Sequence, residues 1–138
     1  MKHILIFIIL SLTSLSAATK QEIVAATLIA EAGGETAFGA MEAVHEVILN
    51  RSVKRNLSTD KVVLQKYQFS CWNGKNIDSV VSKAKKHSKW KQALQIVNSS
   101  KTNHTKGADF YHTKSVSPSW KNSFVQTKVI GSHIFYRG

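Results

Sequence analysis

The sequence predicts an α+β fold in a single domain, with helices in the N-terminal part followed by a small antiparallel β ribbon. Its 138 residues match one domain of ordinary size, and 43% of them are hydrophobic, which is typical of a packed core. Apolar residues recur at helical spacing as far as about residue 100. Beyond Gly107, β-branched and aromatic residues lie between turn signals, a pattern typical of short strands.

Residues 1–18 have the three-part layout of a secretory signal peptide. A basic start precedes an apolar run over residues 4–10, and Ser16-Ala17-Ala18 offers a cleavage site between small residues. The run is too short for a membrane-spanning helix, which needs about 20 apolar residues. We therefore expect export to the periplasm, the cell wall or the extracellular space, with residues 19–138 as the mature domain. A retained anchor is the alternative.

The first two helices are predicted by a capping pattern and by periodicity. Thr19 and Glu22 have the spacing of a capping box, so a helix is expected over residues 20–32, where Gly33-Gly34 stops it. Apolar residues at helical spacing predict a second helix over residues 37–53.

The later elements are shorter and are separated by turn signals. In order, they are a short helix from Ser58 or Thr59 to about Tyr67, a loop over residues 68–76, a helical segment over residues 78–100 that breaks near Ser88, and strands within residues 110–113 and 125–136. The lysines of the 78–100 segment are expected to form a solvated face.

The charge of the chain indicates an anionic partner. The formal net charge is +11, which suits nucleic acid, a membrane surface or a cell-wall polymer. Export argues against nucleic acid and for anionic polymers of the cell wall. The single cysteine excludes an intramolecular disulfide framework, and the absence of a CxxC pair excludes a cysteine-rich zinc module.

Glu31 is the residue most suited to chemistry. It follows Val24 by seven helical steps, about 700°, so the two side chains point in nearly the same direction, with Leu28 beside them. A carboxylate at the end of an apolar stripe should be partly desolvated, which raises its pKa. A carboxyl that stays protonated near neutral pH can act as a general acid. A helix-end residue that turns to solvent is the alternative.

The other acidic residues suit more ordinary roles. Glu35 follows the two glycines and is expected to cap the second helix, although it can also face the same cleft as Glu31. Asp109 alternates with its neighbours in a predicted strand. Glu35 and Asp109 are therefore the possible second carboxylates. Glu42 and Glu46 lie four residues apart on a helix and are expected to face solvent.

Four blocks of sequence carry a resemblance to a known family. They are Leu28-Ile29-Ala30-Glu31-Ala32-Gly33-Gly34-Glu35 with Val47-Ile48-Leu49-Asn50-Arg51, then Gln68-Phe69-Ser70-Cys71-Trp72-Asn73, then Gly107-Ala108-Asp109-Phe110-Tyr111-His112-Thr113, and last Ile130-Gly131-Ser132-His133-Ile134-Phe135-Tyr136-Arg137. In this order they resemble the SleB-type cell-wall hydrolases, the family of the spore-cortex-lytic enzymes. The resemblance implies a compact lysozyme-like catalytic domain over residues 19–138 that cuts the glycan strands of peptidoglycan.

The resemblance places the essential glutamate of the family on Glu31. Hydrolytic glycosidases normally use two carboxylates, whereas only Glu31 combines a helix-face argument with a motif match. We therefore expect a lytic transglycosylase, in which Glu31 protonates the oxygen between MurNAc and GlcNAc and then assists attack by the 6-hydroxyl of the sugar. This reaction requires no metal and no cofactor.

Several polar and aromatic residues are expected to bind the sugar. They are Gln68, Phe69, Ser70, Trp72, Asn73, Tyr111 and His112. For Trp72 and Tyr111, packing in the core with a satisfied polar tip is an equal alternative. The protein is expected to act as a monomer on peptidoglycan, without a stable membrane span.

Three other functions remain open at this stage. In a zinc-dependent N-acetylmuramoyl-L-alanine amidase, His45, His112 and His133 would converge on a metal, although His45 lacks the second histidine of a helical zinc motif. In a thiol hydrolase, Cys71 would act with His112. A non-catalytic cationic wall-binding protein would explain the charge alone.

Overall fold

The computed structural model describes residues 17–138. The predicted signal peptide therefore lies, except for Ala17 and Ala18, outside the described residues. The elements are α1 (Lys20–Ala32), α2 (Ala40–Arg55), α3 (Thr59–Leu64), η1 (Ser70–Trp72), α4 (Ile77–Ala84), α5 (Trp90–Val97), β1 (Phe110–Thr113), η2 (Ser119–Ser123), β2 (Val125–Ile130) and β3 (His133–Arg137). None of these helices is long and apolar enough to cross a membrane.

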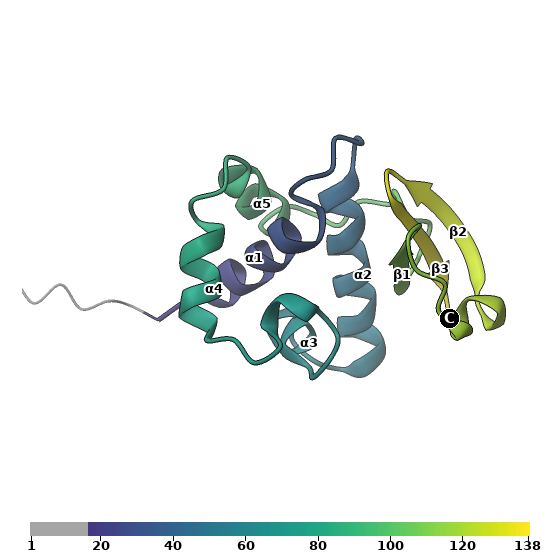
Figure 1. Ribbon diagram of the computed structural model, residues 1–138, viewed down its shortest axis with the longest axis horizontal. Coiled ribbons are helices and arrows are strands. Elements are labelled where there is room, and N and C mark those ends of the chain that lie inside the picture. The colour runs from purple at the N-terminus through teal and green to yellow at the C-terminus, as the bar shows by residue number, and fades with distance from the viewer. Residues whose placement is uncertain (1–16) are drawn as a thin grey trace, which may run out of the picture.

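The helices gather on one side of the molecule and the sheet on the other, with α2 between them (Figure 1). Helix α1 contacts each of the other four α-helices and supplies much of the core. Its small residues Ala25 and Ala26 are buried and allow close approach of the neighbouring helices. The predicted capping box is confirmed, because Thr19 Oγ1 accepts from the Glu22 amide and the Glu22 carboxylate accepts from the Thr19 amide.

The sheet has the strand order β1-β3-β2 with antiparallel pairing throughout. Tyr111 pairs with Phe135 and Thr113 with His133, so Tyr111, His133 and Phe135 share one face. Phe135 is fully buried and belongs to the same core as the helices, which identifies that face as the one toward the helices. His112 lies on the opposite face of β1.

The predicted α+β architecture is confirmed, with small differences at the ends of elements. Helix α2 begins at Ala40 rather than at residue 37, because Gly39 takes a left-handed conformation (φ 77°) that only glycine adopts easily. The expected break near Ser88 separates α4 from α5.

The expectation that Glu46 faces solvent is wrong. Its side chain is buried, and its carboxylate accepts hydrogen bonds from the backbone amides of His104 (2.5 Å) and Thr105 (2.9 Å). The segment that follows α5 therefore crosses α2 at this carboxylate. Buried amides need a partner, so Glu46 holds this segment in place. Glu42 is half-buried.

Candidate active site around Glu31

Glu31 occupies the last turn of α1, at the point where the helical part meets the sheet. Burial raises the pKa of its carboxyl above the ordinary value, against a hydrogen bond from the Tyr111 hydroxyl and the positive charge of Arg51, which both lower it. The predicted desolvation of this carboxyl is confirmed. Glu31 therefore tends to hold its proton in surroundings that also contain groups able to stabilise the ionised form.

Arg51 reaches this site from α2 and is held at several points. It is only 7% exposed, and its Nε donates to the carbonyl oxygen of Asp109 at 2.7 Å. Its guanidinium carbon lies 5.5 Å from the ring centroid of Phe69 and 5.3 Å from that of Phe110. Burial lowers the pKa of the Arg51 guanidinium, and the nearby Tyr111, Asp109 and Glu31 act against this by favouring its charged form. Arg51 is thus a cation held by several contacts beside the half-buried Glu31 carboxyl.

The sequence interpretation gave Arg51 no role of its own, although a signal was present. Arg51 follows Val44 by seven residues and Ile48 by three, which places a charge on the apolar stripe of α2. A charge on a buried face requires a partner, so this position alone indicates an interaction site.

Tyr111 reaches Glu31 from β1. Burial is the main cause that raises the pKa of its hydroxyl well above the ordinary value, and the negative charge of Glu31 adds to it. The hydroxyl lies close enough to Glu31 for each group to shift the pKa of the other. The Tyr111 ring stands edge-on to His133, with the centroids 5.0 Å apart, and is also near Phe135 at 5.5 Å. These contacts fix the direction of the hydroxyl.

Cys71, on η1, lies close enough to Glu31 for the two groups to affect each other. Burial and the Glu31 charge raise the pKa of the Cys71 thiol to about 12. A thiol with so high a pKa is protonated at neutral pH and is a poor nucleophile. The thiol-hydrolase alternative is therefore not supported.

Glu35 points to the turn between β2 and β3 and does not cap α2. Its carboxylate accepts from the amide (3.3 Å) and the hydroxyl of Ser132, and the hydrogen bond from the Ser132 hydroxyl is the main cause that lowers its pKa. The predicted capping role is wrong, because α2 begins at Ala40 after the N-cap residue Gly39, and within residues 17–138 no side-chain cap bond forms there. The Nδ1 atom of buried His133 lies 3.7 Å from the Glu35 carboxylate and has no hydrogen-bond partner in the described part of the chain.

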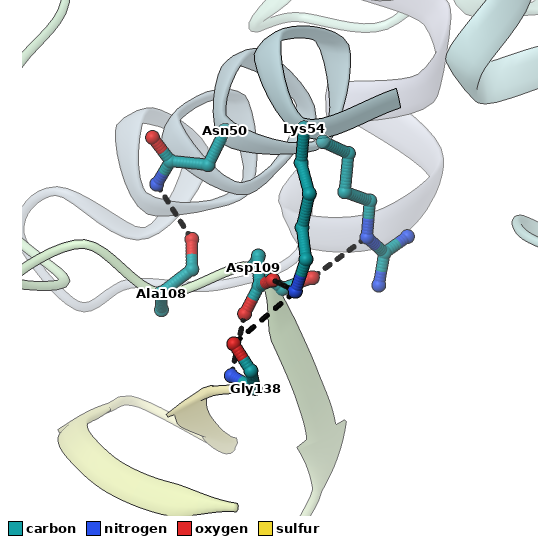
Figure 2. A network of polar contacts seen from close by, with 6 residues as sticks. Asn50, Lys54, Ala108, Asp109 and Gly138 are labelled. Atoms are coloured by element: carbon teal, nitrogen blue, oxygen red, sulfur yellow. Dashed lines mark hydrogen bonds and ion pairs between the residues drawn. The ribbon is translucent and has the colours of Figure 1, made fainter. Parts of the chain in front are cut away.

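Asp109 fastens the end of the sheet to α2 (Figure 2). One carboxylate oxygen lies 2.8 Å from Lys54 Nζ and the other accepts from the Gly138 amide at 2.8 Å. Lys54 also donates to the Gly138 carbonyl at 3.1 Å, and Asn50 Nδ2 donates to the Ala108 carbonyl at 2.7 Å. Both oxygens of Asp109 are thus engaged in a structural contact.

The structure separates the seven predicted sugar-binding residues into three groups. Tyr111 and Phe69 lie at the Glu31–Arg51 site. Ser70 and Asn73 are exposed beside Cys71. The other three have partners elsewhere: Gln68 accepts from Arg55 (2.9 Å), Trp72 donates to Thr27 Oγ1 (3.1 Å), and His112 bonds the Tyr136 hydroxyl (2.9 Å) on the far face of β1.

The histidines of the amidase alternative do not converge. His112 and His133 are on opposite faces of the sheet, and His45 is on α2. Within residues 17–138, no cluster of three or more His, Cys, Asp or Glu side chains could hold a metal ion.

Comparisons with known proteins agree with this architecture. Among solved structures, the catalytic domain of the germination-specific lytic transglycosylase SleB from Bacillus anthracis has a similar fold, with a TM-score of 0.69 and 22% sequence identity over 90% of this chain and 98% of that one. A search of curated proteins gave no significant match. The model of a family described as cell wall hydrolase matches residues 34–136, beginning three residues after Glu31. Since that match spans most of the sequence, the chain belongs to the cell wall hydrolase family and is an enzyme of cell-wall breakdown.

Proposed function

We propose that the protein cleaves the glycan strands of peptidoglycan between MurNAc and GlcNAc as a lytic transglycosylase, with Glu31 as its single catalytic carboxyl. The observation that carries this proposal is the burial of Glu31 beside Tyr111 and Arg51. Burial favours the protonated acid needed to begin the reaction. The two neighbours favour the carboxylate that forms when the proton leaves.

The reaction needs one group that works first as acid and then as base. Glu31 gives its proton to the oxygen that links the two sugars, so that the glycosidic bond breaks and positive charge develops at the MurNAc anomeric carbon. The Glu31 carboxylate then takes the proton of the MurNAc 6-hydroxyl while that oxygen bonds the same carbon. The product is a 1,6-anhydro ring, and no water is consumed.

Arg51 and Tyr111 would act on Glu31 at the intermediate stage. The Tyr111 hydroxyl donates to the newly formed carboxylate, and the Arg51 guanidinium supplies a nearby positive charge. Hydrogen bonds to a charged group are typically worth about 1.5–3 kcal/mol. Both groups are held by their own contacts, so they need little rearrangement as charge develops.

The other two candidate carboxylates favour transglycosylation over hydrolysis. A hydrolytic glycosidase pairs its acid with a second carboxylate that acts as base or nucleophile. Asp109 is engaged with Lys54 and Gly138, and Glu35 is engaged with Ser132. The similar solved structure is itself a lytic transglycosylase, which agrees with this choice. The predicted signal peptide over residues 1–18 would bring the enzyme to its substrate outside the cytoplasm.

Digestion of purified peptidoglycan, followed by mass analysis of the fragments, tests the proposal. We expect fragments with 1,6-anhydro ends from the wild type, none from Glu31→Gln, and measurable activity from the matched control Glu35→Gln. Reducing ends would indicate hydrolysis instead. Release of free stem peptides that EDTA abolishes and zinc restores would indicate the amidase. Binding to peptidoglycan without release of any fragments would indicate a wall-binding protein.

A further inference from the structure

A groove of about 620 Å³ lies between α1 and α4, and Glu31 is not among its lining residues. Its apolar part combines three alanines, Ala26, Ala30 and Ala84, with Ile29 and Val80. Its polar part includes Lys75, Lys83 and Lys86, together with Ser79 and His87. The groove therefore combines an apolar floor with a cationic rim.

The three lysines are available for a ligand. No acidic residue lines the groove, and across residues 17–138 neither a hydrogen bond nor an ion pair occupies their ammonium groups. Lys85, which lies between Lys83 and Lys86, provides the contrast, because it forms an ion pair with Glu22 outside the groove. Three unpaired cations around one groove attract an anionic ligand.

The groove adjoins the proposed catalytic carboxyl. Ile29 and Ala30, which line it, directly precede Glu31 on α1. Cys71 also lines the groove, and the charge of Glu31 acts on its thiol. A ligand in the groove would therefore be part of, or attached to, the sugars that meet Glu31.

The charge of the groove selects one part of the substrate. In peptidoglycan the MurNAc carboxyl is joined to the stem peptide through an amide, and the N-acetylated sugars carry no charge. The carboxylates belong to the stem peptide, which also carries the methyl groups of its alanines. We propose that the groove between α1 and α4 binds the stem peptide, with Lys75, Lys83 and Lys86 facing its carboxylates and the alanine floor contacting its methyl groups. This inference rests on the proposed function, because it assumes that the glycan meets Glu31.

The first experiment measures binding of a soluble stem tetrapeptide with free carboxylates, by chemical shift changes in the NMR spectrum of Glu31→Gln. This variant keeps the groove and does not depend on catalysis. We expect shifts at residues that line the groove, and affinity about three- to tenfold lower when Lys75, Lys83 and Lys86 are all changed to Gln. Changing Lys61, Lys91 and Lys128 to Gln removes the same charge elsewhere and should leave the affinity unchanged.

The second experiment compares cleavage of peptidoglycan with that of the same material after its stem carboxylates have been converted to amides. We expect the wild type to prefer the charged substrate, and the Lys75, Lys83 and Lys86 variant to lose that preference while the control keeps it. Equal losses in both variants would overturn the proposal in favour of general charge attraction. If a soluble teichoic acid shifts the NMR signals of the groove lysines and the peptide does not, the proposal is overturned in favour of that polymer.

The two experiments separate the two proposals. If Glu31→Gln binds the peptide at the groove but the wild type releases no anhydro fragments, the proposed function fails and the groove assignment stands. If anhydro fragments form while the peptide causes no shifts at the groove, the groove assignment fails and the proposed function stands.

Discussion

Three effects act on the pKa of Glu31, one that raises it and two that lower it. Burial favours its neutral form, whereas the Tyr111 hydroxyl and the Arg51 charge favour its ionised form, and the effect of burial is the largest. The side chain is half-buried, and both neighbours act against the desolvation that this burial causes. The net result is a raised pKa, which favours the protonated acid, and groups that stabilise the ion are already in place.

The burial of Glu31 should make the free energy of unfolding depend on pH. The pKa of Glu31 is higher in the folded state than in the unfolded state. The stability that its proton confers is therefore fully present below the unfolded pKa of about 4.3. This stability is lost as the pH rises through the raised pKa of the folded state. Gln does not titrate. Glu31→Gln should therefore unfold at a higher temperature than the wild type at pH 8, with a smaller difference at pH 4. Thermal unfolding at both pH values measures this, and a difference that is independent of pH would contradict it.

Tyr111→Phe removes one of the groups that lower the pKa of Glu31. The pKa of Glu31 should rise further, so the alkaline limb of the activity profile should move to higher pH. The maximal rate should fall by about 10- to 100-fold, because the carboxylate intermediate loses a hydrogen bond to a charged group. Rates of fragment release across a pH series measure both effects. Tyr67→Phe, at an exposed tyrosine, serves as the control, and an unmoved profile in Tyr111→Phe would exclude the contact with Glu31.

At the scale of elements, the contact between α2 and the sheet determines the geometry of the site. Arg51 is on α2 and Tyr111 is on β1, so their separation depends on how these two elements dock. The bonds from Asn50, Arg51 and Lys54 to residues 108–109 all cross this contact (Figure 2). Residues 50–54, little more than one turn of α2, thus align the sheet beside Glu31.

Asp109→Asn should weaken this docking without removing the chemistry. The change removes the ion pair with Lys54 at a side chain that is only 7% exposed, and we expect a loss of about 1–3 kcal/mol in the free energy of unfolding. Chemical denaturation measures this loss, with Glu42→Gln as a control. Anhydro fragments should still form at a temperature where the variant is folded. Complete inactivity of a folded Asp109→Asn would instead identify Asp109 as a second catalytic carboxylate.

At the scale of the whole molecule, the site lies where two differently built halves meet. The helices supply Glu31, Arg51 and the groove, and the sheet supplies Tyr111. The formal net charge of +11 comes largely from lysines at exposed positions, such as Lys61, Lys91 and Lys128. Attraction to the wall and cleavage of the strand are therefore separable properties.

Wall binding should depend on salt, whereas the kind of product should not. Exposed charges are screened beyond roughly 8 Å at physiological ionic strength, so association with insoluble peptidoglycan should weaken as salt is raised. A sedimentation assay with Glu31→Gln measures binding without digestion. The anhydro ends released by the wild type should be the same at each salt concentration. Binding that is unchanged by salt would show that charge does not hold the protein to the wall.

The sequence by itself determined most of the elements and the partial burial of the Glu31 carboxyl. Helix α1 has the predicted limits, 20–32, because its capping box and its glycine stop act on neighbouring residues. Strand β1 likewise covers the predicted residues 110–113. The burial of Glu31 followed from its angular position on α1, which depends only on helix geometry.

The tertiary structure alone decided which groups meet. Glu35 accepts a hydrogen bond from Ser132, 97 residues away, and Glu46 accepts hydrogen bonds from the amides of His104 and Thr105. Predictions from neighbouring residues alone therefore assigned both carboxylates wrongly. Alternation along β1 requires Tyr111 and His112 to face opposite sides, but the docking of Phe135 into the helical core determined that Tyr111 faces Glu31. Backbone periodicity is set by hydrogen bonds within an element, whereas the partners of a buried charge depend on how elements pack.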